Sequence, residues 1–314
     1  MSEPEAIADK SRGIFARIGL SLLSLLVPGL GLIRAGSLAL GIKFAALHLT
    51  FLFLLVGYFA FGPTLTIGSW AIVLIIGLAV VLICQLGSSI ITFLRSRHYV
   101  SERQWWSRWY IIVAGVLVWF GIQEVAASNM RAHYRNFYVP AESMRPTLDI
   151  NDRFLAKMSD FGELRRGDIL IVKNEGSEYV KRLIGLPGDN LELKAGKVLI
   201  NGSVAKYEET SILPAEDICD VAGSDSVEIM QETLPGTKTS HLVVDCGANY
   251  LDDVGPIQLG DDQYYFLGDN RDLSADSRVE GPLGLGVVSR DRIVGYTLFV
   301  YWSDDRKRIG IEIN

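Results

Sequence analysis

Residues 65–94, LTIGSWAIVLIIGLAVVLICQLGSSIITFL, contain no charged side chain over 30 positions. A second uncharged stretch, FAALHLTFLFLLVGYFAF, covers the 18 positions 44–61. A helix needs about 20 apolar residues to cross a hydrocarbon core of ~30 Å. The two stretches therefore predict membrane-spanning helices, at about 44–61 and 66–94, and they decide the fold of the N-terminal part.

A third apolar stretch follows a basic connector. Trp109–Gln123 has only 15 residues, but tryptophans before it and Val125–Ala127 after it extend the predicted span to about 106–127, because tryptophan favours the membrane–water interface. The connector Arg95–Arg108 carries four arginines against one glutamate. Since basic loops stay on the cytoplasmic side of a membrane, we expect this connector inside and the residues after 128 outside.

The first 35 residues are ambiguous. Ile18–Ile33 is apolar, but it is 16 residues long and is interrupted by Pro28, Gly29 and Gly31. This pattern is consistent with a re-entrant or interfacial segment at about 18–33, and a short fourth span is the alternative. An acidic leader followed by several spans argues against a cleavable signal. We favour three spans with a cytoplasmic N-terminus.

Charge and hydropathy predict two unlike domains, a membrane region at 1–128 and a β-rich domain at 129–314. The mean hydropathy of the chain is +0.26. Residues 1–128 hold 9 basic and 5 acidic side chains, whereas residues 129–314 hold 21 and 31. An acidic domain argues against a nucleic-acid partner, whose phosphates need a basic surface. The four histidines form no pair at metal-binding spacing, so no metal is expected.

Residues 129–314 are predicted to be mostly β, because short apolar or alternating runs recur between turn residues. These runs are Phe154–Lys157, Asp168–Val172, Tyr179–Ile184, Tyr264–Leu267 and Ile293–Tyr301. Leu191–Leu193 and Val198–Ile200 flank a short turn and predict a hairpin. The polar, acidic segment at about 203–262 has weak periodicity, and we interpret it as a cap inserted on a small β core.

A serine and a lysine are the candidate reactive groups. Ser143 lies in YVPAESMRPTL (138–148), where two prolines fix extended backbone on either side. Lys181 lies in YVKRLIGLPGD (179–189), and on a strand it faces away from Val180 and Arg182. A lysine whose pKa is lowered by burial can act as the base for a serine. Taken alone, each motif is more often a proline turn or an exposed strand lysine.

Four runs, in order, resemble those of the bacterial type I signal peptidases, which are membrane-bound serine proteases with a Ser-Lys dyad. They are Val139–Leu148, Arg166–Leu170, Lys181–Asp189 and Gly268–Arg278. The resemblance covers about residues 135–302, and the family usually has only one or two membrane anchors. It implies an N-terminal multi-span helical membrane region followed by a mainly-β extracytoplasmic catalytic domain of the signal-peptidase type, with an inserted cap subdomain.

The resemblance also implies roles for individual residues. Ser143 matches the nucleophile and Lys181 the general base. Ser274 matches a hydroxyl that hydrogen-bonds to the lysine and orients it, while Asp276 and Arg278 match a supporting ion pair.

Two further positions match residues that shape the site, and two depart from the family. Met144 and Arg182 match. Ala141 stands where the family often has a serine whose hydroxyl helps to bind the oxyanion. Glu142 stands where glycine is common, and its charge would oppose a developing oxyanion unless the side chain points away.

The implied function is removal of signal peptides from exported preproteins at the outer face of a cell membrane. Cleavage would follow small residues and pass through an acyl-enzyme, without a metal or cofactor. The expected partners are these preproteins and membrane lipid, with a place near the secretion machinery. One alternative is a Ser-Lys processing peptidase for a dedicated partner. Another is an inactive membrane-anchored β-domain receptor or assembly factor, against which the presence of both Ser143 and Lys181 weighs.

Two of the three cysteines, Cys219 and Cys246, lie in the half expected to be exported. A disulfide between them suits an oxidising compartment and would restrain the cap by about 3 kcal/mol. Two unpaired cysteines are the alternative, because sequence spacing does not show that their Cα atoms approach each other.

The predicted orientation can be tested with a reporter that is active only in the cytoplasm. Fused after Gly247, the reporter should be silent. The basic connector Arg95–Arg108 is expected to lie in the cytoplasm, so the span that follows it leads out of the cell. A control fusion within this connector should be active. Strong activity after Gly247 would overturn the orientation and the preprotein-processing role.

Overall fold

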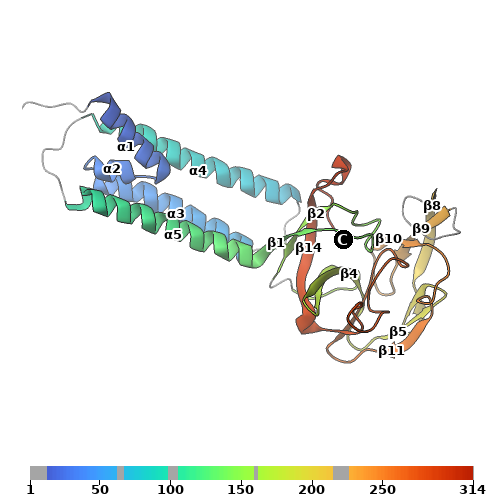
Figure 1. The fold of residues 1–314 in the computed structure, drawn as a ribbon. Coiled ribbons are helices and arrows are strands. Elements are labelled where there is room, and N and C mark those ends of the chain that lie inside the picture. The colour runs from blue at the N-terminus through green and yellow to red at the C-terminus, as the bar shows by residue number, and fades with distance from the viewer. Residues whose placement is uncertain (1–12, 62–66, 98–104, 159–161, 215–225, 314) are drawn as a thin grey trace, which may run out of the picture. The chain divides into compact units, whose positions relative to one another are not determined.

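The computed structural model describes residues 13–61, 67–97, 105–158, 162–214 and 226–313 (Figure 1). The chain divides into two compact units, residues 1–131 and 132–314. The described part of the first unit is helical, and the second unit consists mainly of β-strands.

Three long apolar helices dominate the first unit. The α-helices are α1 (Ile14–Leu26), α2 (Leu30–Arg34), α3 (Leu38–Phe61), α4 (Ile67–Arg95) and α5 (Trp109–His133), with a 3₁₀ turn η1 at Trp105–Ser107. By length and composition α3, α4 and α5 fit membrane insertion. Within the described residues, each coincides with one of the three predicted apolar stretches. Large apolar side chains such as Ile83 and Leu117 are exposed on these helices, as expected for surfaces that meet lipid.

The ambiguous segment at 18–33 lies in two short helices. Gly29, with φ of 84°, separates α1 from α2 in a conformation that favours glycine. The 13 residues of α1 reach only about 20 Å at 1.5 Å per residue, which is shorter than a bilayer core. Hydrogen bonds of 2.7 Å join the Ser21 and Ser24 hydroxyls to those of Ser89 and Thr92, so α1 lies along α4 (Figure 1).

A seven-stranded antiparallel sheet, in the order β1-β2-β14-β3-β4-β12-β13, forms the main part of the second unit. Its strands are β1 (Tyr134–Tyr138), β2 (Arg153–Lys157), β3 (Ile169–Asn174), β4 (Ser177–Gly185), β12 (Gln263–Leu267), β13 (Val288–Ser289) and β14 (Ile293–Trp302). The five strand predictions from alternating or apolar runs are confirmed as β2, β3, β4, β12 and β14. Short 3₁₀ turns, η3 (Arg290–Arg292) and η4 (Arg306–Arg308), flank β14.

Two smaller sheets complete the unit. The predicted hairpin is confirmed as β5 (Asn190–Lys194) and β6 (Lys197–Ile200), which join β7 (Ser203–Val204) and β11 (Val254–Gln258) in a four-stranded sheet. The third sheet contains β8 (Lys206–Pro214), β9 (Ser226–Thr233) and β10 (Ser240–Asp245). The two ends of the segment at 203–262, β7 and β11, pair with the β5–β6 hairpin, and its role as a cap stays a prediction.

The predicted disulfide involves a residue outside the described part of the chain. Cys246 follows β10 and is disulfide-bonded, whereas Cys219 lies outside the described residues. The pairing of these two cysteines stays a prediction. Cys84, on α4, is a free buried thiol.

The core of the seven-stranded sheet packs beneath the Ser143 motif. Phe154 is fully buried with Met144, Leu148 and Ile171, and its ring stacks on Phe137 at a centroid distance of 5.4 Å. This packing fixes the two strands that flank the motif.

We expect Phe154→Ala to lower the free energy of unfolding by about 3–5 kcal/mol, because it leaves a cavity in this core. Chemical denaturation of the detergent-solubilised protein measures the change. Tyr250→Ala is the matched control: Tyr250 is 85% exposed, so its effect should stay within about 0.5 kcal/mol. A similar small effect for Phe154→Ala would contradict the packing argument.

Candidate functional site

Ser143 lies in the connection between β1 and β2. Two backbone hydrogen bonds close this connection at its base, from Val139 N to Asp152 O at 2.9 Å and from Asn151 N to Val139 O at 3.0 Å. The side chains of Met144 and Leu148 are buried in the core below it. The closed base and the two apolar anchors hold the half-buried Ser143 at a fixed place beside the sheet.

Lys181, near the middle of β4, points at this serine. Its Nζ donates a hydrogen bond of 2.8 Å to Ser143 Oγ and one of 3.1 Å to Val180 O. The side chain is buried, with 3% of the residue exposed. Burial lowers the pKa of Lys181 to about 8, although the carboxylates of Asp276 and Asp269 oppose the shift. The neutral amine is therefore accessible near neutral pH, as a general base requires.

The loop that follows β12 supports the pair through Asp276 and Arg278. Asp276 binds the Arg278 guanidinium through both carboxylate oxygens at 2.9 Å and accepts a hydrogen bond of 3.0 Å from Gly268 N. Gly268 lies against the backbone of Ser143: a methyl group there would be 2.4 Å from Ser143 O. The expected ion pair is thus formed, and it is buried directly behind the Ser143 segment.

Ser274 does not make the expected hydrogen bond to Lys181. Its Oγ is buried and has no hydrogen-bond partner among the described residues. A methyl group at Gly268 would lie 2.2 Å from this oxygen, so the hydroxyl packs against the glycine in the same loop. The hydrogen bond to Lys181 is therefore absent from this structure, and a positioning role for Ser274 stays a prediction.

Arg182 forms a second buried ion pair, with a partner that the sequence analysis did not single out. Its Nε and Nη2 bind the two carboxylate oxygens of Asp269 at 2.8 and 2.7 Å. Thr147 donates a hydrogen bond of 2.5 Å to the same carboxylate. Burial alone would raise the pKa of Asp269, but the charge and hydrogen bonds of Arg182 hold it below its usual value. Arg182 and Asp269 carry opposite charges and lie in two of the four runs that resemble the family, and this is the sequence signal that could have indicated the pair.

Glu142 and Ala141, the two positions that depart from the family, have defined surroundings in the structure. Glu142 accepts a hydrogen bond of 3.0 Å from Arg145 Nη1 within the Ser143 loop, and the same guanidinium binds Asp149 at 2.6 Å. Ala141 is exposed and has no side-chain donor. The backbone N–H of Ser143 donates no hydrogen bond to another described residue, which leaves it available to an oxyanion.

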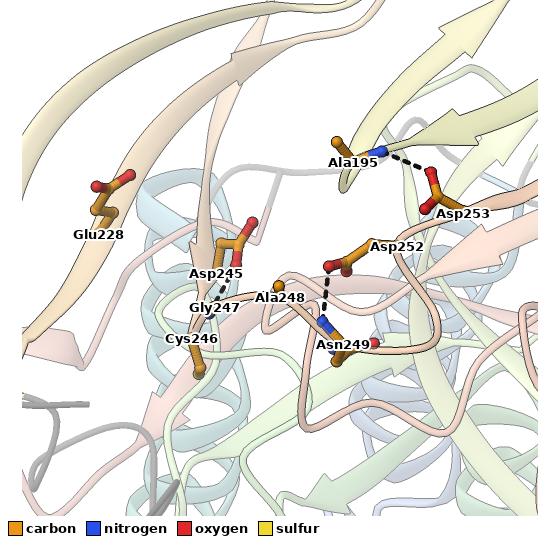
Figure 2. Close-up of a pocket in the computed structure, with 9 residues that line it drawn as sticks. All are labelled: Ala195, Glu228, Asp245, Cys246, Gly247, Ala248, Asn249, Asp252 and Asp253. Carbon is orange, nitrogen blue, oxygen red and sulfur yellow. Dashed lines mark hydrogen bonds between the residues drawn. The ribbon is translucent and has the colours of Figure 1, made fainter. Parts of the chain in front are cut away.

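A separate hollow of about 490 Å³ is lined by four acidic side chains: Glu228, Asp245, Asp252 and Asp253 (Figure 2). Asp253 accepts a hydrogen bond of 2.9 Å from Ala195 N, and Asp252 accepts one of 2.8 Å from Asn249 N. Across the described part of the chain, no group of three or more His, Cys, Asp or Glu side chains is arranged to hold a metal ion.

A lysine amine in contact with a serine hydroxyl, both supported by buried ion pairs, is the arrangement of a serine hydrolase that uses a lysine base. A family model described as signal peptidase, peptidase S26, matches residues 104–302. The chain belongs to this family, and its activity is that of a signal peptidase I, a serine endopeptidase.

Three curated relatives support the same assignment. Signal peptidase I P of Bacillus subtilis subsp. natto is 35% identical over 56% of this chain and 80% of its own length. Signal peptidase I S of Bacillus subtilis is 33% identical over 55% and 79%, and a probable signal peptidase I-2 of Synechocystis is 26% identical over 68% and 84%. A crystal structure of a signal peptidase I from Enterococcus faecalis is 22% identical, covers 44% of this chain and 98% of that chain, and gives a TM-score of 0.26.

Adding a hydroxyl at position 141 should improve turnover. Removing one oxyanion donor costs about 2.7–4 kcal/mol in other enzymes, and Ala141→Ser supplies a donor two positions before Ser143. We expect kcat for preprotein cleavage to rise by about twofold or more. Ala248→Ser, in the acidic hollow, is the control and should leave kcat unchanged. If kcat for Ala141→Ser is unchanged or lower while folding is intact, the oxyanion hole is completed by another group.

Proposed function

We propose that Ser143 is the nucleophile and Lys181 the general base of a signal peptidase reaction that removes signal peptides from preproteins. The observation that carries the proposal is the hydrogen bond of 2.8 Å between Lys181 Nζ and Ser143 Oγ. The lowered pKa of Lys181, about 8, supports it because the base must be uncharged.

The reaction follows from this geometry in two stages. Lys181 Nζ takes the proton from Ser143 Oγ, which bonds to the scissile carbonyl carbon while the carbonyl oxygen gains negative charge. The peptide C–N bond then breaks, and the ammonium of Lys181 gives its proton to the leaving amine. In the second stage, Lys181 takes a proton from water, whose oxygen bonds to the acyl carbon. The ester bond to Ser143 Oγ then breaks, and the ammonium of Lys181 returns its proton to that oxygen.

The surrounding residues have supporting roles in this proposal. Asp276 and Arg278 fix the loop that contains Ser274. The ion pair of Arg182 with Asp269 fixes β4 next to Lys181. Met144 anchors the nucleophile's backbone in the core. None of these side chains needs to touch the substrate, so their removal should act through the position of Ser143 or Lys181.

We place the catalytic unit outside the membrane and assign α3, α4 and α5 as three spans. The excess of arginine in the connector before α5 supports this orientation. A substrate whose apolar signal segment already lies in the bilayer would then present its cleavage site near the enzyme, which replaces a search in three dimensions. The β8–β9–β10 sheet is our candidate for the cap subdomain.

Lys181 is the residue whose replacement tests the mechanism. We expect Lys181→Ala to lower kcat by about 100-fold or more, because general-base catalysis is lost, and Lys181→Arg to do the same, because guanidinium does not deprotonate. Lys173→Ala, an exposed lysine on β3, is the matched control. Ser143→Ala should also be inactive. Near-normal turnover of Lys181→Ala would exclude the Ser-Lys assignment.

The pH dependence provides a second test. The base is active when neutral, and the neutral fraction of Lys181 increases as pH rises through its pKa of about 8. The rate of preprotein cleavage should therefore rise from pH 7 to pH 9, with its midpoint close to that pKa. A rate that falls over this range would contradict a lysine base.

A further inference from the structure

The β8–β9–β10 sheet contains a fully buried glutamate whose partner lies in the catalytic loop. Glu232, on β9, has no exposed surface. Its two carboxylate oxygens accept hydrogen bonds of 3.0 and 2.6 Å from Nη1 and Nη2 of Arg271. Arg271 belongs to the Gly268–Arg278 run that also contains Ser274, Asp276 and Arg278. The contact therefore joins the small sheet to the loop behind the nucleophile.

Other groups of the small sheet hold the same carboxylate. Tyr207, on β8, donates a hydrogen bond from its hydroxyl group to Glu232 Oε1. His241 Nε2, on β10, lies 2.9 Å from Oε2. Burial alone would raise the pKa of Glu232, but the charge of Arg271 and the contacts with His241 and Arg271 hold it well below its usual value. The carboxylate is thus ionised, and one residue from each strand of the sheet contributes to the cluster.

From Arg271 the contacts continue to the nucleophile. Arg271 Nε donates a hydrogen bond of 3.2 Å to Gly268 O, and its backbone N–H donates one of 2.9 Å to Val244 O on β10. Asn270 N, one residue before Arg271, donates a hydrogen bond of 3.2 Å to Ser143 O. Two hydrogen bonds and the short backbone segment between Gly268 and Asn270 thus link the guanidinium held by Glu232 to the backbone of Ser143.

Backbone pairing strengthens this connection. Val244 N donates a hydrogen bond of 2.8 Å to Asp269 O, so the start of the catalytic loop runs as a parallel bridge along β10. Asp269 is also the partner of Arg182, next to Lys181 on β4. The small sheet therefore contacts the loop segment that is bonded to the backbone of Ser143 and to Arg182, the neighbour of Lys181 on β4.

We propose that Glu232 is a positioning residue for the signal peptidase reaction, acting through Arg271 to hold the loop that fixes the backbone of Ser143. This inference rests on the proposed role of Ser143. It gives the β8–β9–β10 sheet a catalytic purpose: the sheet supplies the carboxylate that pairs with the buried Arg271 of the loop.

Glu232→Gln is the primary test, because glutamine keeps the shape of the side chain and removes its charge. Turnover of a preprotein in detergent is normalised to the number of active sites, counted by labelling with an acylating penem-type inhibitor. We expect kcat per site to fall about tenfold or more, because a small displacement of reacting groups has effects of this size. KM should stay within about twofold of the wild-type value, because Glu232 lies in no surface that the substrate touches.

Two further variants separate positioning from folding. Glu228→Gln, on the same strand but exposed in the acidic hollow of Figure 2, should leave kcat per site unchanged. In a double-mutant cycle, Glu232→Gln added to Arg271→Gln should lower kcat no further than Arg271→Gln alone, since Glu232 acts through Arg271. If Glu232→Gln gives no sites to count, Glu232→Asp takes its place, with an expected fall of about threefold or more.

A wild-type kcat per site in Glu232→Gln, or in Glu232→Asp if that variant is used, would overturn the proposal and leave Glu232 with a purely structural role. Additive losses in the double-mutant cycle would overturn the route through Arg271. Neither result would affect the proposed function, which fails separately if Ser143→Ala retains turnover.

Discussion

Transfer of the Ser143 proton to Lys181 needs a lysine without its charge, so the amine must be kept from water and from unpaired carboxylates. Burial meets the first condition. The second is met because the two nearby acids are already bound, Asp276 by Arg278 and Asp269 by Arg182. Each arginine offsets the negative charge of its carboxylate, which would otherwise favour the protonated form of Lys181. The two ion pairs are thus part of the chemistry of the base.

These ion pairs impose a cost that the fold has to offset. A buried charge whose partner is removed destabilises a protein by about 3–5 kcal/mol, and the loop at 268–278 contains several such charges. The structure satisfies them with groups from β4, from the Ser143 loop and from the β8–β9–β10 sheet. The charged side chains of this loop are consequently bonded to β4, to the Ser143 loop and to the β8–β9–β10 sheet.

Much of the architecture was predictable from the sequence, because strands with one buried face alternate apolar and polar residues. Runs such as Phe154–Lys157 and the β5–β6 hairpin have this local pattern, and the long apolar helices are evident from composition. The β8–β9–β10 sheet was not predicted as such. Its strands carry many acidic residues, and its buried Glu232 looks like a surface residue until Arg271, 39 positions later, is brought beside it.

The site itself divides in the same way. Ser143 and Lys181 were identified by the resemblance of their motifs to a family, whereas Asp269 and Thr147 were not singled out, because their contacts with Arg182 depend on long-range folding. Ser274 was expected to bond to Lys181, but its rotamer in the structure leaves the hydroxyl without a partner among the described residues. The motif indicates which residues lie close together in the fold, but local packing decides which way a hydroxyl group points.

Gly268 has a mechanical consequence for this site. Its α-carbon has no room for a methyl group, because Ser143 O and Ser274 Oγ occupy that space. Two chain segments 125 positions apart in sequence therefore meet backbone to backbone, with nothing compressible between them. A side chain can absorb a displacement by changing rotamer, but a hydrogen atom cannot. A side chain at position 268 would push the Ser143 segment and the loop apart, so the spacing of these two backbones depends on the missing Cβ of Gly268.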